Sequence, residues 1–200
     1  MPDLPLVLPA PAVPAFVSGF DRAGKIVRGL DALGPVADRD VVVIAARDGP
    51  ILDGLVALGA RVRCVPLSSP LAIPADPGSA DVVVGLWSAF RGVDAGELAE
   101  VDRVLRPGGR QLVVHDYGRD DVSRLYGDRP EYGAWSHRLG PFLVGGFRVR
   151  VIHCFWEFES TASMSEWLAE AFGEAGAALA AALTRPRLSY NVAIYHRSRP

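Results

Sequence analysis

The sequence lacks the features that mark several broad classes of protein. Its two cysteines, Cys64 and Cys154, fall in expected strands without the spacing of metal ligands, so we expect reduced core residues and no metal site. The formal net charge is only −2, with basic and acidic residues well mixed, which gives no electrostatic reason to expect a nucleic acid partner. No segment approaches the ~18 to 20 uninterrupted apolar residues of a membrane span. The amino terminus lacks the basic start of a signal peptide, so we expect a cytoplasmic protein without a membrane partner.

The sequence also has no internal repeat and no long polar linker, which predicts a single domain over residues 1–200. A chain of 200 residues with half apolar composition is enough for one well-packed core. Prolines recur at positions 2, 5, 9, 11 and 14, and this frequency argues against a helix there. We therefore expect residues 1–15 to form an extended, proline-rich arm on the surface.

Apolar patterns between residues 22 and 67 predict alternating helices and strands. Residues 22–33 have the periodicity of an amphipathic helix, and the apolar run 41–44 is typical of a strand buried on both faces. Pro50 suits the first position of a second helix, and residues 61–67 predict a second strand. This order is the opening of a doubly wound α/β sheet, in which ligands bind at the carboxyl ends of the strands.

The middle of the chain resembles a known family. The segment Pro77-Gly-Ser-Ala-Asp-Val-Val-Val-Gly-Leu-Trp87 is followed by an apolar helical stripe, the turn Leu105-Arg-Pro-Gly-Gly-Arg110 and the strand 111–115. In this order the segments resemble the second half of a class I S-adenosylmethionine-dependent methyltransferase, in which a "pdgsfDvV" strand, a helix and an "LrPGG" turn follow one another. The resemblance extends over about residues 20–197 and implies a transferase with a Rossmann-like, mostly parallel sheet.

The carboxyl-terminal part agrees with this resemblance. Residues 147–158 and 188–196 predict two long strands, and a helix from residue 162 to about 183 separates them. This arrangement is similar to the antiparallel hairpin that ends the family's sheet. We therefore expect a doubly wound sheet with an antiparallel edge.

The resemblance implies a site for S-adenosylmethionine, but the residues at the matching positions depart from the family's motif. The family's first strand usually ends in D-x-G-x-G-x-G. Here the acid falls on Val43, the first two glycines fall on Ala45 and Arg47, and only the last falls on Gly49. Glycine is required at such positions because the backbone takes up open dihedral angles and approaches the ligand closely. The family's acid that accepts hydrogen bonds from the ribose hydroxyls aligns with Pro66.

The connection after the second strand is short as well. Only residues 68–76 are available for the helix and third strand that the family usually inserts, so we expect that strand to be missing and the adenine-side wall to be missing or rebuilt. Trp87, at the end of the next strand, remains a cofactor-side candidate. Arg47 can be interpreted as a loop cation paired with Asp48 or Asp76. It can also be interpreted as a side chain that fills the pocket, or that turns the site toward an anion at the start of the next helix.

Polar residues follow the strand that ends at His115. One hypothesis makes His115 or Asp116 a general base toward an oxygen or nitrogen nucleophile, with Tyr117 or Trp87 orienting the substrate. The simpler interpretation is that His115 forms a hydrogen bond within the sheet, while Asp120 or Asp121 caps the next helix. Adjacent strand residues point to opposite faces, so His115 and Asp116 are not a metal-binding pair.

Aromatic residues mix with glycines between positions 129 and 147. Tyr132 and Trp135 there suit either a lid that faces a substrate or an ordered surface loop that buries its own rings. The following strand is apolar on both faces around Trp156, which indicates burial or a partner surface. An exposed edge near Trp156 would permit a homodimer.

Two functions from different classes agree with these patterns. The first is a non-catalytic module with a degraded S-adenosylmethionine site that binds a partner protein or another small molecule, as Ala45, Arg47 and Pro66 suggest. The second is an active methyltransferase with an atypical pocket, acting on a small molecule or a protein side chain. A dinucleotide-binding oxidoreductase is a weaker third option, because it needs the same missing glycines and the same missing acid.

Overall fold

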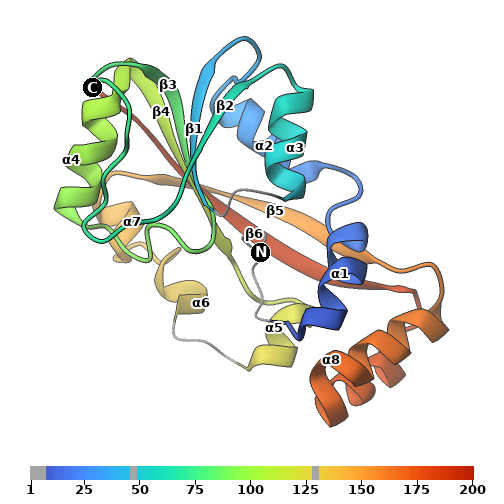
Figure 1. The fold of residues 1–200 in the computed structure, drawn as a ribbon. Helices are drawn as coiled ribbons and strands as arrows, with labels where there is room; N and C mark the ends of the chain where they lie inside the picture. The colour runs from blue at the N-terminus through green and yellow to red at the C-terminus, as the bar shows by residue number, and fades with distance from the viewer. Residues whose placement is uncertain (1–7, 46–48, 128–130) are drawn as a thin grey trace.

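The fold is built on a mixed sheet with helices on both faces (Figure 1). The computed structural model describes residues 8–45, 49–127 and 131–200, except for the side chains of Glu131 and Tyr132. The six strands lie in the order β2-β1-β3-β4-β6-β5. Strands β2, β1, β3 and β4 are parallel, whereas β6 runs antiparallel to both β4 and β5. The strands are β1 (Asp40–Ile44), β2 (Arg61–Val65), β3 (Ala80–Gly85), β4 (Leu105–Asp116), β5 (Arg148–Glu157) and β6 (Arg187–Ser198).

The predicted doubly wound sheet with an antiparallel edge is therefore confirmed. Successive residues of β1 alternate between two apolar clusters, with Val41 and Val43 in one and Val42 and Ile44 in the other. This is the pattern of a strand buried on both faces, as the sequence predicted. The helices are η1 (Ala10–Ala12, a 3-10 helix), α1 (Val13–Gly19), α2 (Lys25–Leu33), α3 (Pro50–Ala57), α4 (Ala95–Val104), α5 (Asp121–Tyr126), α6 (Glu131–Ala134), α7 (Pro141–Val144) and α8 (Thr161–Ala182).

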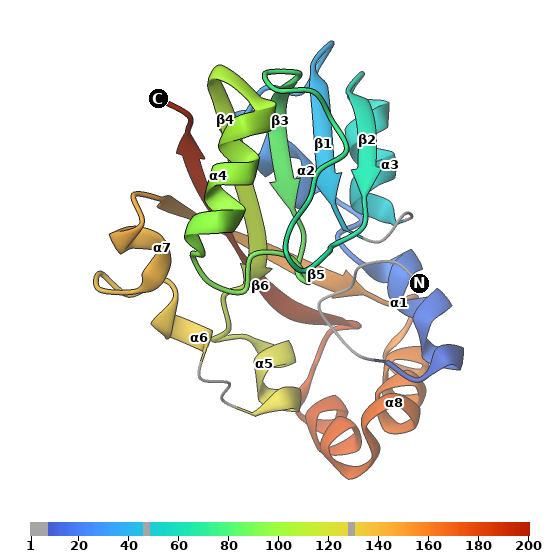
Figure 2. The ribbon, with the colours of Figure 1, turned by 60° about the vertical axis from the view of Figure 1, so that its left-hand side comes forward.

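The helices divide between the two faces of the sheet. Helices α1, α2, α3 and α8 pack on one face, and α4 and α7 cover the other. Figures 1 and 2 place α1, α5 and α8 at the lower end of the molecule, beyond the ends toward which β1 and β3 point. The carboxyl edge of the sheet, where this fold binds ligands, is therefore the edge that these three helices surround. Among the described residues, no helix is long and apolar enough to cross a membrane.

The connection between β2 and β3 contains neither a helix nor a strand, so the expected absence of a third strand is confirmed. Helix α4 holds this connection instead. The Ile73 amide donates to a carboxylate oxygen of Glu100 at 2.7 Å, and the Arg103 guanidinium donates to the carbonyls of Ile73 and Ala75 at 2.9 and 2.8 Å. Because no third strand pairs with it, β2 forms one edge of the sheet.

The predicted extended arm is wrong for its described part. Residues 10–12 form η1 and residues 13–19 form α1, with a proline in the first two positions of each helix. Proline is tolerated there because the amide hydrogen that it lacks would have no partner within the helix. Phe16 is buried against the Trp156 ring, and the Trp167 indole N–H donates to the Ala12 carbonyl at 3.0 Å. The segment is part of the core rather than a surface arm.

The expectation of an exposed edge near Trp156 is also wrong. Trp156 is only 1% exposed, and Phe16, Phe20 and Trp167 surround its ring. Phe20 even forms an isolated antiparallel bridge with Trp156. Of the two alternatives for this apolar strand, burial within the chain holds for the face of Cys154 and Trp156, whereas His153 is exposed and Phe155 half-buried on the other face.

Candidate functional site

The turn after β1 keeps one glycine of the family's motif, and the backbone requires it. Gly49 has a φ of 142°, a conformation that side-chain-bearing residues rarely adopt, and it directly precedes α3. Ala45 is buried, and its amide donates to the Val65 carbonyl at 3.1 Å, which extends the pairing of β1 with β2. Arg47 and Asp48 lie outside the described residues, so both interpretations of Arg47 stay predictions.

The end of β2 offers no carboxylate. Pro66 follows the strand directly, its side chain is exposed, and its ring can neither accept a hydrogen bond nor carry charge. Asp76 is the one acid between residues 61 and 79, and it lies shortly before β3, near the opposite edge of the sheet. The position that holds the ribose-binding acid in the family is therefore apolar here.

Trp87, Tyr190 and Asp116 form a hydrogen-bonded chain beyond the ends of β3 and β4. The Trp87 indole N–H donates to the Tyr190 hydroxyl oxygen at 3.0 Å, and that hydroxyl donates to a carboxylate oxygen of Asp116. Burial, with the nearby Asp116 charge, raises the pKa of Tyr190 well above its usual range. The tyrosine therefore stays protonated and acts as the donor to Asp116.

Phe20, just after α1, covers this chain of hydrogen bonds. Its ring centre lies 5.9 Å from that of Trp87, 5.8 Å from that of Tyr190 and 6.4 Å from that of Trp156. Asp21 fixes the segment, because its carboxylate accepts the amides of Lys25 and Ile26 at 2.9 and 2.8 Å at the start of α2. Aromatic rings thus occupy the space beyond the carboxyl end of β3 and beside the first residues of β6.

His115 lies on the opposite face of β4 from Asp116, as the alternation of a strand predicted. It is 1% exposed, and its Nε2 donates to the Phe90 carbonyl at 2.9 Å. The Trp135 ring packs against it with centres 4.6 Å apart. The predicted hydrogen bond exists, and its partner is a loop carbonyl after β3 rather than a neighbouring strand.

The two aspartates after β4 serve the start of α5 and its link to β6. Asp120 is the N-cap residue: its carboxylate accepts the Ser123 amide and the Asn191 amide, both at 2.7 Å. Burial raises the pKa of Asp120. Asp121 accepts the Ser189 amide at 2.8 Å. The simpler interpretation of these acids as helix-capping residues is confirmed for Asp120.

The proposed substrate residues fall into two groups. Tyr117 and Trp135 are half-buried on the face that also holds His115, and the Arg91 guanidinium lies 5.1 Å from the centre of the Trp135 ring. Tyr132 belongs to α6, but its side chain lies outside the described residues. The structure therefore brings Trp135 together with His115, and Trp87 together with Asp116, on two different faces of the sheet.

At the strand ends, two described positions differ from what the resemblance implies for S-adenosylmethionine. Pro66 supplies no acceptor for the ribose hydroxyls. Trp87, the cofactor-side candidate after β3, packs against Phe20 and forms a hydrogen bond with Tyr190. In the described part of the chain, no group of three or more His, Cys, Asp or Glu residues could hold a metal ion.

Several solved structures share this fold. A proposed type II methyltransferase from Anaeromyxobacter dehalogenans superposes with a TM-score of 0.59 and 19% identity, over 90% of this chain and 97% of that chain. The chain has the class I methyltransferase fold. The MccD protein (TM-score 0.52, 14% identity, 86% of this chain and 95% of that one) shares this fold. So does an S-adenosylmethionine-dependent methyltransferase from Aquifex aeolicus (TM-score 0.50, 16% identity, 88% and 93%).

The methyltransferase fold does not by itself assign an activity. Identities this low establish an architecture, while function depends on the residues of the site. No family model and no curated protein matches the chain.

Two residues at the carboxyl edge were not anticipated from the sequence. Tyr190 enters from β6, 74 positions after its partner Asp116. Phe20 enters from the segment after α1 and contacts Trp87 and Tyr190. Leu188, Tyr190 and Val192 share one face of β6. The register that sets Val192 opposite Asp116 is a property of the folded sheet, and no local pattern encodes it.

Proposed function

We propose that this chain is a binding module on a methyltransferase fold, without the usual S-adenosylmethionine site and without methyl transfer. One observation carries the proposal: Trp87, Tyr190 and Asp116 are joined by hydrogen bonds at the edge where the fold binds ligands, and Phe20 packs on Trp87 and Tyr190. These side chains make internal contacts in place of contacts with a cofactor.

The environments of the two candidate bases support the non-catalytic reading. A general base must come within hydrogen-bond reach of the proton that it removes. His115 is buried beneath Trp135 with its Nε2 committed to Phe90, and Asp116 accepts the Tyr190 hydroxyl on the other face. A substrate would have to displace the Trp135 ring to reach His115, and would have to compete with the Tyr190 hydroxyl for Asp116.

The ligand of such a module would be a partner protein or a small molecule other than S-adenosylmethionine. The ends of β1 and β2 support this, because Ala45 and Pro66 replace a glycine and an acid that the resemblance requires. The missing third strand removes a further part of the usual cofactor wall.

Calorimetric titration with S-adenosylmethionine and S-adenosylhomocysteine tests the proposal. We expect no binding to the natural protein at micromolar concentrations. Pro66→Asp restores the carboxylate that would accept hydrogen bonds from the ribose hydroxyls, at an exposed position. Arg47→Gly restores the second glycine of the motif. We expect any gain of affinity in the double variant. The melting temperature of each variant serves as the folding control.

Micromolar binding by the natural protein would overturn the proposal. It would favour an active methyltransferase with an atypical pocket, and His115→Ala and Asp116→Asn would then be tested for loss of transfer. Absence of binding to the natural protein, with or without gain in the double variant, supports a module that has lost the usual site.

A further inference from the structure

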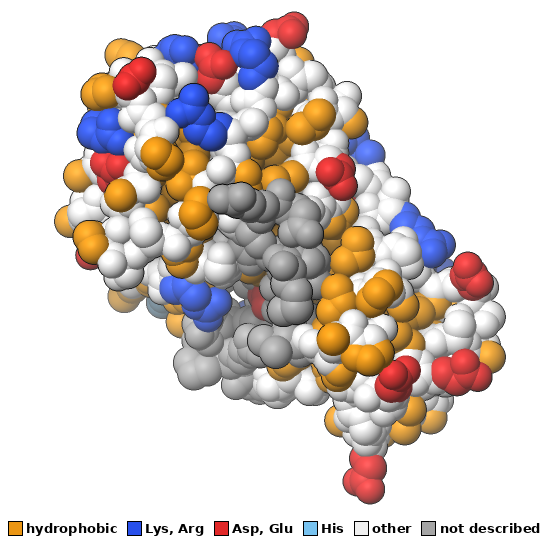
Figure 3. All heavy atoms as spheres, in the orientation of Figure 1, with side chains coloured by type: hydrophobic (Ala, Val, Ile, Leu, Met, Phe, Trp, Pro, Cys, Tyr) orange, Lys and Arg blue, Asp and Glu red, His pale blue; other side chains and the backbone are white. Residues whose placement is uncertain are grey.

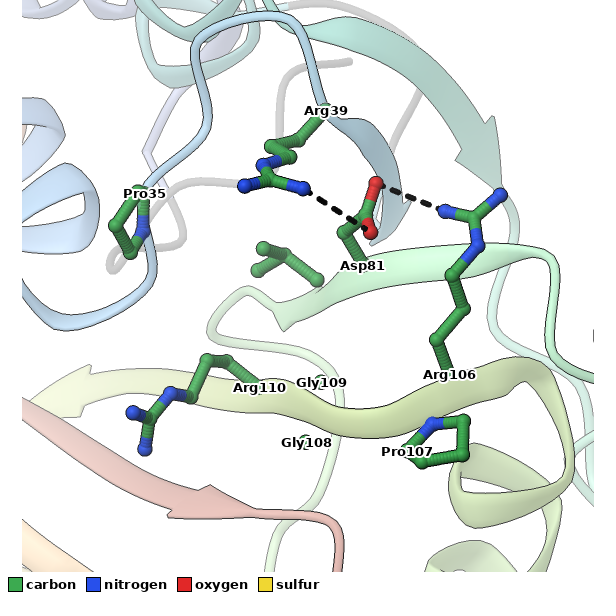
Figure 4. A pocket seen from close by; sticks show the side chains of 9 residues that line it. Pro35, Arg39, Asp81, Arg106, Pro107, Gly108, Gly109 and Arg110 are labelled. Carbon is green, nitrogen blue, oxygen red and sulfur yellow. Dashed lines mark ion pairs between the residues drawn. The ribbon is translucent and has the colours of Figure 1, made fainter.

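A pocket of about 220 Å³ opens at the opposite edge of the sheet, where β1, β3 and β4 begin (Figure 4). Arg39, Asp81 and Arg110 line it together with Pro35, Val82 and the turn 106–109. Figure 3 shows basic side chains, with acidic ones among them, at the top of the molecule, where these strands start. The pocket is thus separated by the length of the strands from the carboxyl edge described above.

Cations outnumber anions around this pocket. Arg106 pairs with Asp81 at 2.8 Å and with Asp40 at 2.9 Å. Arg61 pairs with Asp40 at 2.8 Å, and Arg39 reaches Asp81 only at 3.8 Å. Among the residues that line the pocket, three are arginines, Arg39, Arg106 and Arg110, and one is an aspartate, Asp81, so the lining has an excess of two cations.

Arg39 and Arg110 lie on opposite walls of the pocket (Figure 4). The Arg110 guanidinium donates to the neutral Ser198 hydroxyl, so this contact leaves its charge uncompensated. Its aliphatic stem packs under the turn after α2. A Cβ at Gly34 would lie 3.2 Å from the Arg110 Cβ, which is tighter than most real contacts, so glycine lets this turn close over the arginine stem.

The backbone of the turn 106–109 shapes the remaining wall. The pairing of β3 with β4 jumps from Ala80 opposite Leu105 to Val82 opposite Arg110, so the turn bulges out of the ladder. Gly108 has a φ of 75°, and no heavy atom lies within 4 Å of the place where its Cβ would stand. A ligand can approach this backbone closely, because no side chain intervenes.

We propose that this pocket binds the phosphate group of a small molecule. The planar guanidinium presents a fork of donors that matches phosphate oxygens, and arginine is favoured wherever such bidentate recognition matters. A phosphate monoester carries about −1.5 to −2 charge at neutral pH, which matches an excess of two cations. The pocket lies where β1, β3 and β4 begin, at the edge opposite their carboxyl ends. Phosphate binding there is therefore independent of whether S-adenosylmethionine binds.

Calorimetry at low ionic strength with glycerol phosphate and with inorganic phosphate tests this site. We expect saturable binding of the ester, at least as tight as that of the inorganic ion. Arg110→Gln and Arg39→Gln should each weaken binding by about tenfold, the size expected for one lost charge-assisted contact. Arg138→Gln is the matched control, since it removes the same charge from an exposed position outside the pocket and should change the affinity by less than about twofold.

Two variants on different walls keep the test valid if one of them fails to fold. The proposal is overturned if the natural protein shows no saturable binding of glycerol phosphate, or if both arginine variants bind it as the natural protein does. Binding of inorganic phosphate without binding of the ester would also contradict a small-molecule site. Failure here leaves the S-adenosylmethionine titration unaffected, because that titration reports on the other edge of the sheet.

Discussion

At the scale of single residues, the Tyr190 hydroxyl is the group whose removal should cost the most. It accepts from Trp87 and donates to Asp116 in a fully buried site, so Tyr190→Phe removes one partner from each of them. A buried polar group that loses a partner costs about 1–3 kcal/mol. We expect the free energy of unfolding, measured by urea denaturation, to fall by about that amount.

Tyr195→Phe is the control for this prediction. Tyr195 is equally buried in the same strand, where its ring stacks on Phe142 with centres 4.1 Å apart. No hydrogen bond to its hydroxyl is found within the described part of the chain, so the change should cost little. Equal losses in the two variants would show that the hydrogen-bonded chain adds no stability of its own.

The residues of the carboxyl edge show how far sequence reasoning reached. The opposite facing of His115 and Asp116 followed from the alternation of a strand, and Asp120 followed from the preference of aspartate for N-cap positions. Tyr190 and Phe20 could not be foreseen, because they reach the site from distant segments through sheet register and helix packing.

At the scale of elements, the short connection after β2 depends on one ion pair of α4. Arg103 hydrogen-bonds Glu100, and together with the Ile73 amide it lowers the pKa of Glu100 from its ordinary 4.5 to about 2. A group whose pKa is lowered by folding stabilises the folded state fully above its ordinary pKa. That contribution is then lost as the pH falls through about 2.

Glu100→Gln should therefore destabilise the protein near neutral pH, by about 1 kcal/mol or less because the pair is partly exposed. The difference from the natural protein should shrink between pH 4.5 and about 2 in urea unfolding followed over a pH series. Glu97→Gln on the same helix is the control. Burial, and then Asp94, raises the pKa of Glu97, so its stabilising contribution is lost as the pH rises and the trend should reverse. The same trend in both variants would contradict the role of the Arg103 pair.

Most of the helices and strands could be predicted from the sequence. Apolar runs located β1 and β3, Pro50 marked the first turn of α3, and the nine residues 68–76 were too few for a third strand. The prediction for the amino terminus was wrong because proline breaks a helix in its interior but not at its start. Its position decides the matter: at the first positions of η1 and α1 it is compatible with a helix.

At the scale of the whole molecule, loss of the third strand leaves β2 as one edge of the sheet, while Phe20 bridges the far edge strand at Trp156. Strand edges invite pairing with a second copy, and proteins oppose this with short, charged edge strands. Strand β2 has five residues, and two of them are the exposed Arg61 and Arg63. We infer that these two arginines limit self-association through β2, which has no third strand beside it.

Arg63→Val should consequently favour association of two copies through β2. In a symmetric dimer the changed residue occurs twice, and each copy contributes up to about 1 kcal/mol on the scale of strand propensities, so we expect the dissociation constant to fall by roughly tenfold. Sedimentation equilibrium at several protein concentrations measures it. Arg138→Val makes the same exchange at an exposed position outside the sheet. It is the control that distinguishes pairing through β2 from non-specific hydrophobic association. If Arg138→Val associates as strongly as Arg63→Val, or if neither differs from the natural protein, the arginines of β2 do not guard this edge.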